Sequence, residues 1–174
     1  MQINSKKFII LHPILIALFP VFLVYHQNIH VLLLDGLILP ILFILSVAIA
    51  LWYGIKIILK NTIKSALLSS FYIFLFFSYG HVFIIIQSNL TVEFFGLIHV
   101  ILLVSYTVFV VLGTYYVVKT NRRLNNLTTI ANAMSITALV FVFFSIGIYN
   151  FENTYNNFQV EDSNPIVLGN DFKK

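Results

Sequence analysis

Five long hydrophobic runs constrain the fold of this chain more than any other feature of its sequence. They cover residues 8–25, 39–59, 63–86, 94–118 and 127–149, and each is rich in Leu, Ile, Val and Phe. A helix needs about 20 mostly apolar residues to cross the core of a bilayer. Strands of a membrane β-barrel are about half as long, and an open sheet leaves backbone groups unpaired in lipid. The sequence therefore predicts an all-α polytopic membrane protein, a bundle of five transmembrane helices.

The composition supports a membrane protein of one domain. Of the 174 residues, 60% are hydrophobic and only 9% are charged, whereas a soluble domain carries about 25% charged residues. A soluble chain this short could not bury so much apolar surface. The absence of cysteine excludes disulfides, thiolate metal sites and thiol nucleophiles. We expect residues 1–150 to form the transmembrane domain and residues 151–174 to form a polar extracytoplasmic tail or linker.

The basic residues predict how the bundle is oriented. With five crossings, the Lys and Arg residues near the helix ends, apart from the C-terminal tail, fall on one side of the membrane: Lys6, Lys7, Lys56, Lys60, Lys64, Lys119, Arg122 and Arg123. Lys and Arg accumulate in short cytoplasmic loops. We therefore expect a plasma-membrane protein with a cytoplasmic N-terminus and an extracytoplasmic C-terminus. The formal charge of +4 is then a topology signal, and a nucleic-acid partner is not expected.

The first hydrophobic run has features of its own. Lys6 and Lys7 precede it as in a signal peptide, but no small-residue cleavage site follows, so we expect a retained helix. Pro13 and Pro20 are predicted to lie inside this helix and to kink it. His12 lies near its inner end and is expected to be isolated.

Small residues recur at helical spacing on the second and third predicted helices. Such stripes let helices approach closely, within a bundle or at a dimer face. The stripes are Ser46 with Ala50 and Gly54, Ser65 with Ser69, and Ala66 with Ser70.

Polar residues near the outer ends of the helices are the candidates for a site. This predicted outer polar cluster consists of His26, His30, Asp35, His81, Glu93 and His99. Such groups suit a metal or a lipid headgroup, and they equally suit interfacial side chains that reach water. The sequence lacks a Glu-x-x-His spacing that would help to fix a ligand set, and no metal or cofactor is predicted.

Catalysis within the membrane would need polar groups deep in the bundle. The available ones are Ser105, Thr107, Asn132 and Thr137. Hydroxyls in membrane helices usually bond to their own backbone. No Ser-His-Asp arrangement, Gly-rich phosphate loop or pair of buried carboxylates is apparent, so the chain is not expected to be an enzyme on its own.

Three segments resemble a known family. They are HP, LFP and YHQNI within residues 12–29, LFFSYGHV at residues 75–82, and LNNLT at residues 124–128. Together they resemble the N-terminal membrane region of bacterial sulfatase-like membrane proteins of the alkaline phosphatase superfamily. The lipoteichoic acid synthases have a similar plan, with five helices before an external domain. The resemblance implies a helical anchor followed by an extracytoplasmic, metal-dependent catalytic domain.

The family's metal-binding motif has no counterpart before Lys174, so no catalytic residue is carried over. We expect either a truncated or split gene product or an anchor module that works alone. The main functional hypothesis is a membrane anchor or scaffold for an external hydrolase or phosphotransferase domain or subunit, with the lipid bilayer as its other partner. The alternative is a stand-alone protein that binds or transports a lipid or small solute at its outer face. The sequence does not predict an oligomeric state.

Overall fold

The computed structural model describes residues 9–88, 95–120 and 124–163. Within these residues it contains five α-helices and no strand, which confirms the predicted all-α bundle. Four helices are long and apolar enough to cross a membrane, whereas α1 is apolar but has 16 residues. The elements are α1 (His12–Gln27), the short 3-10 helix η1 (Leu34–Leu37), α2 (Ile38–Leu59), α3 (Thr62–Gln87), α4 (Phe95–Lys119) and α5 (Asn125–Ser163).

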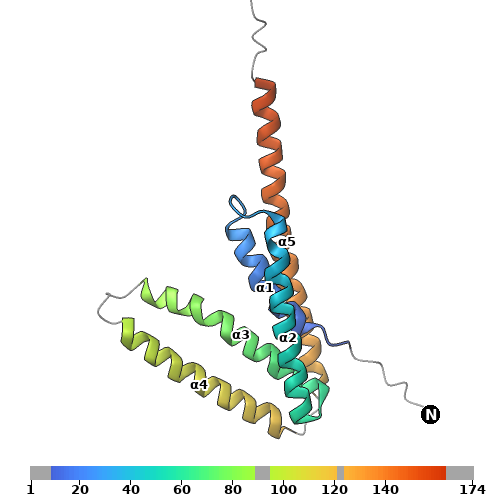
Figure 1. Ribbon diagram of the computed structural model, residues 1–174, viewed down its shortest axis with the longest axis vertical. Helices are drawn as coiled ribbons and strands as arrows, with labels where there is room; N and C mark the ends of the chain where they lie inside the picture. The colour runs from blue at the N-terminus through green and yellow to red at the C-terminus, as the bar shows by residue number, and fades with distance from the viewer. Residues whose placement is uncertain (1–8, 89–94, 121–123, 164–174) are drawn as a thin grey trace, which may run out of the picture.

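The helices are arranged as a stem and a leaning hairpin. Figure 1 shows α1, α2 and the first part of α5 side by side, with α3 and α4 inclined away from them. α1 lies against α2, α3 and α5, while α4 packs mainly on α3. Successive helices run in opposite directions, because each connecting segment turns the chain back along the helix before it (Figure 1). α1 is therefore the central helix of the stem, although it is the shortest.

The junction between α2 and α3 is a tight turn that local chemistry explains. Lys60 ends α2 in the left-handed conformation, with φ 51°. The next residue, Asn61, caps α3, because its side-chain oxygen accepts hydrogen bonds from the backbone N–H groups of Ile63 (3.1 Å) and Lys64 (3.0 Å). Asn61 therefore provides a hydrogen-bond acceptor for the first N–H groups of α3. The turn at Lys60 and Asn61 brings α3 back alongside the end of α2.

The start of α1 differs from the prediction. The helix begins at His12, so Pro13 lies in its first turn and not in its interior. An N–H group in the first turn has no partner within the helix, so proline removes no hydrogen bond there. Pro20 does lie inside α1, as predicted.

The small-residue stripes have different environments. Ser65, Ala66, Ser69 and Ser70 of α3 are all buried, so this stripe forms a packing seam inside the bundle. The seam lies at the start of α3, the part of the hairpin that reaches the stem. By contrast, the stripe of Ser46, Ala50 and Gly54 is exposed on α2. It therefore faces outward from the part of the chain that the structure describes.

The predicted polar tail is helical over its first part. α5 continues without a break to Ser163, and its polar end projects beyond the stem in Figure 1. Helices end where a stop signal intervenes, and the only Pro and Gly of this region, Pro165 and Gly169, come after Ser163. The segment 150–163 is therefore an extension of a transmembrane helix rather than an irregular linker.

Candidate functional site

His99 of the predicted outer polar cluster contacts two aromatic side chains near the end of the α3–α4 hairpin. Its Nδ1 atom lies 3.0 Å from the Tyr79 hydroxyl, within hydrogen-bonding distance. The Phe83 ring stacks on the imidazole, with 3.9 Å between ring centroids. These contacts hold the start of α4 against the second half of α3. His81, two residues from Tyr79, is exposed.

His30 lies in a different part of the molecule. Its Nδ1 atom is 2.5 Å from the Tyr149 hydroxyl, so it links the segment after α1 to α5. His26 is half-buried and its Nδ1 atom has no hydrogen-bond partner, while Asp35 is exposed in η1. Glu93 lies outside the described residues.

The predicted outer polar cluster is thus divided between two places. The end of α1 belongs to the stem, whereas the start of α4 lies at the far end of the leaning hairpin (Figure 1). Among the described residues, no group of three or more His, Cys, Asp or Glu side chains could hold a metal ion. The structure therefore brings each of two histidines to a tyrosine and does not bring the two histidines to each other.

His12, which was predicted to be isolated, is buried and bonded to another helix. None of its surface is exposed, and its Nδ1 atom lies 2.5 Å from the Ser70 hydroxyl of α3. The prediction was wrong because helical spacing along one run cannot reveal a partner 58 residues away. The small-residue stripe that contains Ser70 was the available signal for a partner. A serine hydroxyl on a closely packed helix surface contacts side chains of the neighbouring helix.

Asn132 of α5 holds the first turn of α1. Its side-chain oxygen accepts hydrogen bonds from the backbone N–H groups of Leu11 (3.0 Å) and His12 (2.9 Å). Its side-chain amide donates to the carbonyl oxygen of Ile9 (2.8 Å). The first N–H groups of a helix have no partner within it, so Asn132 supplies one from another helix. His12, Ser70 and Asn132 form what we call the polar junction of α1, α3 and α5.

The polar junction is suited to holding helices together. An imidazole beside a serine hydroxyl can activate a nucleophile where substrate reaches it, but the His12 side chain has no exposed surface. Two other polar groups considered for chemistry inside the membrane bond to their own helix. Ser105 donates to the carbonyl oxygen of Ile101 and Thr107 donates to that of Leu103, as the sequence predicted.

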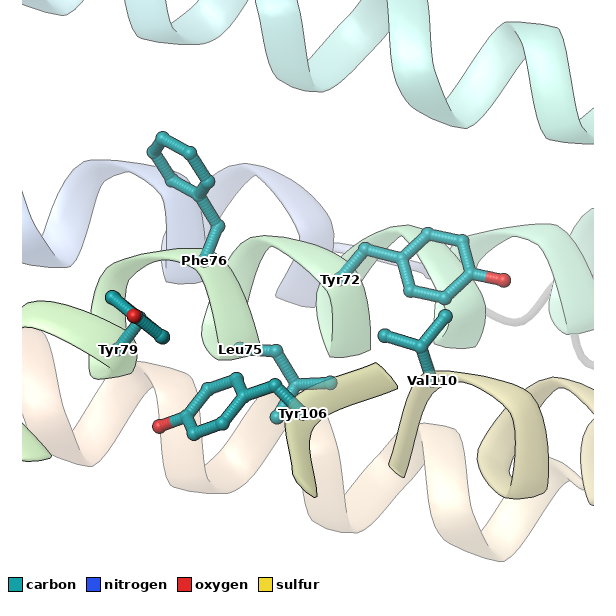
Figure 2. A pocket seen from close by; sticks show the side chains of 6 residues that line it. All are labelled: Tyr72, Leu75, Phe76, Tyr79, Tyr106 and Val110. Carbon is teal, nitrogen blue, oxygen red and sulfur yellow. The ribbon is translucent and has the colours of Figure 1, made fainter. Parts of the chain in front are cut away.

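A groove opens between α3 and α4 at mid-length. It has a volume of about 360 Å³ and is lined by four residues of α3 and two of α4, which Figure 2 shows: Tyr72, Leu75, Phe76, Tyr79, Tyr106 and Val110. In Figure 2 the Tyr72 ring lies beside Val110, and the Tyr79 and Tyr106 rings meet edge to face with 5.3 Å between centroids. The sequence prediction missed this groove, because it depends on how far apart the two helices lie.

Contacts between the groove and the α2–α3 junction fix the base of the hairpin. Toward the α2–α3 junction, the Lys64 ammonium donates to the carbonyl oxygens of Val118 and Thr120, each at 2.8 Å. A cation at the C-terminal end of a helix also complements the helix dipole. Further along, the Phe71 ring occupies the space that the missing side chain of Gly113 leaves. The groove therefore lies in a hairpin that is tied together at its base.

Comparison with known protein families, curated proteins and solved structures finds no match to this chain.

Proposed function

We propose that this chain is a plasma-membrane anchor that presents a sulfatase-like hydrolase or phosphotransferase domain, or a separate subunit of that kind, on the extracytoplasmic side. One observation carries the proposal. α5 leaves the bundle as a continuous helix and extends its polar end to Ser163. A helix rises 1.5 Å per residue, so the stretch from Asn150 to Ser163 would reach about 20 Å beyond the apolar part of α5.

The packing of α5 supports a mechanical role. Its first half is fixed to α1 through Asn132, and Tyr149, at the last apolar turn, contacts His30. No other helix among the described residues lies beside the projecting part in Figure 1. A helix held at its base and free at its tip transmits its orientation to whatever is attached there, as a semi-rigid spacer does.

The sequence resemblance points the same way. Its first segment contains His12, and its last segment ends at Thr128; both side chains are fully buried. Its middle segment contains Tyr79, which contacts His99. The residues of the resemblance therefore take part in helix packing and in closing the hairpin. These contacts set the shape of the membrane region.

The orientation is supported by the two basic junctions. Lys64 of the α2–α3 junction bonds to the C-terminal end of α4, so both junctions lie at the same end of the hairpin. The positive-inside rule assigns that end to the cytoplasm. The projecting end of α5 then lies outside, where a hydrolase domain of the resembled family would have to be.

The proposal is tested by crosslinking from the projecting helix in native membranes. A photoreactive phenylalanine analogue replaces Tyr155, which is 55% exposed on α5, and in a control it replaces Tyr115, which is 59% exposed on α4. We expect crosslinks from position 155, and not from position 115, to peptides of a metal-dependent hydrolase fold, within the same polypeptide or in a partner. Equal crosslinking from both positions, or none to such a fold, would contradict the anchor function.

A further inference from the structure

The walls of the α3–α4 groove are apolar. Three of its six lining residues are tyrosines, and each hydroxyl is bonded away from the groove. The partners are Thr114 for Tyr72 (2.6 Å), His99 for Tyr79 (3.0 Å) and Ser78 for Tyr106 (3.1 Å). The rings therefore line the groove while their hydroxyls are already satisfied. A peptide or a polar solute would gain little hydrogen bonding from hydroxyls that already have partners, and desolvating its polar groups would cost free energy.

The depth of the groove restricts its occupant further. Its α3 residues run from Tyr72 to Tyr79, in the middle of a helix that spans Thr62–Gln87. Its α4 residues, Tyr106 and Val110, lie in the middle of Phe95–Lys119. The middle of a membrane-spanning helix lies in the hydrocarbon core, where the available molecules are lipid chains and other helices.

The size of the groove distinguishes a chain from a helix. The eight residues from Tyr72 to Tyr79 span about 10 Å along the axis of α3. A packed helix with its side chains is roughly 10–12 Å wide and contacts its neighbour over several turns. The volume of about 360 Å³ is near the lower end of the roughly 300–1,000 Å³ typical of small-molecule sites. The space suits part of a flexible hydrocarbon chain better than it suits a helix.

Contacts at its two ends fix the position of the groove between α3 and α4. The Tyr72–Thr114 hydrogen bond and the Phe71–Gly113 contact lie at one end, and the Tyr79–His99 contact lies at the other. Between these contacts the Tyr106 ring of α4 meets the Tyr79 ring of α3 edge to face. A preformed space needs no rearrangement to accept a ligand, which lowers the cost of binding.

From these features we infer that the α3–α4 groove is a binding site for a hydrocarbon chain of a membrane lipid, held in place longer than the lipids around the rest of the bundle. This site is independent of the anchor function, because it uses only α3 and α4. The alternative function considered from the sequence was that of a lipid-binding membrane protein. The groove agrees with lipid binding, but it places the lipid at the middle of the membrane and not at its outer face.

The test uses the full chain in phosphatidylcholine nanodiscs that contain a trace of phosphatidylcholine spin-labelled near the middle of one acyl chain. Val110→Phe and Leu75→Phe fill the groove from α4 and from α3. Val111→Phe is the matched control, because Val111 is 58% exposed on the outside of α4. Circular dichroism and gel filtration establish that each variant is folded.

We expect wild type and Val111→Phe to immobilise the same fraction of spin-labelled chains, and both groove-filling variants to lose part of that fraction. An immobilised fraction that is equal in all four proteins would overturn the lipid site. Energy transfer between labelled copies of the chain provides a second readout. A groove occupied by another copy would make this signal fall in the groove-filling variants, and that result would also overturn the proposal.

Discussion

The imidazole Nδ1 atom of His12 lies 2.5 Å from the Ser70 hydroxyl, and this contact joins the first turn of α1 to the buried seam of α3. Asn132 of α5 binds the backbone of the same turn. Three helices from distant parts of the chain therefore meet at one polar point. In lipid, where apolar side chains gain little by leaving the solvent for each other, such contacts and close packing hold helices together.

The His12–Ser70 contact should appear as coupling in a double-mutant cycle. We expect His12→Ala and Ser70→Ala to destabilise the bundle individually, and the double variant to lose less than the sum of the two. A coupling between about 0.6 and 1.7 kcal/mol is expected for a hydrogen bond between membrane helices. The free energy of unfolding in mixed micelles, titrated with a denaturing detergent, measures it.

The control for this cycle is Ser46→Ala. Ser46 is exposed on α2 and bonds to the carbonyl oxygen of Phe43 in its own helix. We expect its removal to change the free energy of unfolding by less than about 0.5 kcal/mol. A coupling energy near zero between His12 and Ser70 would show that their contact contributes nothing to stability.

Asn132→Ala should release the start of α1. The variant loses three hydrogen bonds, to Leu11, His12 and Ile9, and leaves their backbone groups without partners. At roughly 0.6–1.5 kcal/mol for each bond, the expected destabilisation is about 2 kcal/mol or more. Hydrogen exchange should rise at the amides of Leu11 and His12.

Asn126→Ala is the matched substitution, because Asn126 is exposed in the first turn of the same helix. It should leave exchange at the start of α1 unchanged. If the amides of Leu11 and His12 exchange at the same rate in both alanine variants, Asn132 does not hold this turn.

Gly113→Ala should separate α3 from α4. A Cβ atom at this position would lie 2.5 Å from the Phe71 ring, so one of the two must move, whereas a Cβ atom at Gly54 of α2 would meet nothing within 4 Å. Both substitutions gain helix propensity equally, so the difference in free energy of unfolding between them isolates the contact. We expect Gly113→Ala to be the less stable by about 1–3 kcal/mol.

A second substitution checks the cause of that difference. Phe71→Leu introduced together with Gly113→Ala removes the ring that the new methyl group meets, so it should recover part of the lost stability. If Gly113→Ala matches Gly54→Ala in stability, the close approach of Phe71 to α4 is not a constraint.

Single cysteines test the orientation of α5, because the wild-type chain has none. Asn126→Cys and Glu152→Cys place thiols at exposed positions toward opposite ends of the apolar part of the helix. A membrane-impermeant maleimide added to intact cells should label position 152 at once. It should label position 126 only after the cells are permeabilised. The reverse pattern would invert the proposed topology and place the projecting helix in the cytoplasm.

The fold class followed from the sequence because its signal is local. Each run of about 20 apolar residues must satisfy its own backbone hydrogen bonds in lipid, and only a helix does so within one segment. The same local logic predicted that the small-residue stripe of α3 allows close helix packing, and this stripe is buried. It failed at Pro13, where capping by Asn132 sets the first turn of α1 at His12.

The candidate sites depended on distances between helices, and no periodicity within one run encodes those. The sequence placed His30 and His99 at the same level, but the lean of the hairpin puts one against Tyr149 and the other against Tyr79. The sequence by itself determined how many helices form and which of their surfaces are apolar, because those follow from backbone hydrogen bonding in lipid. Only the tertiary structure decided that His12 meets Ser70 and that α3 and α4 enclose a groove, because side-chain shape and hydrogen bonds between helices set how closely they pack.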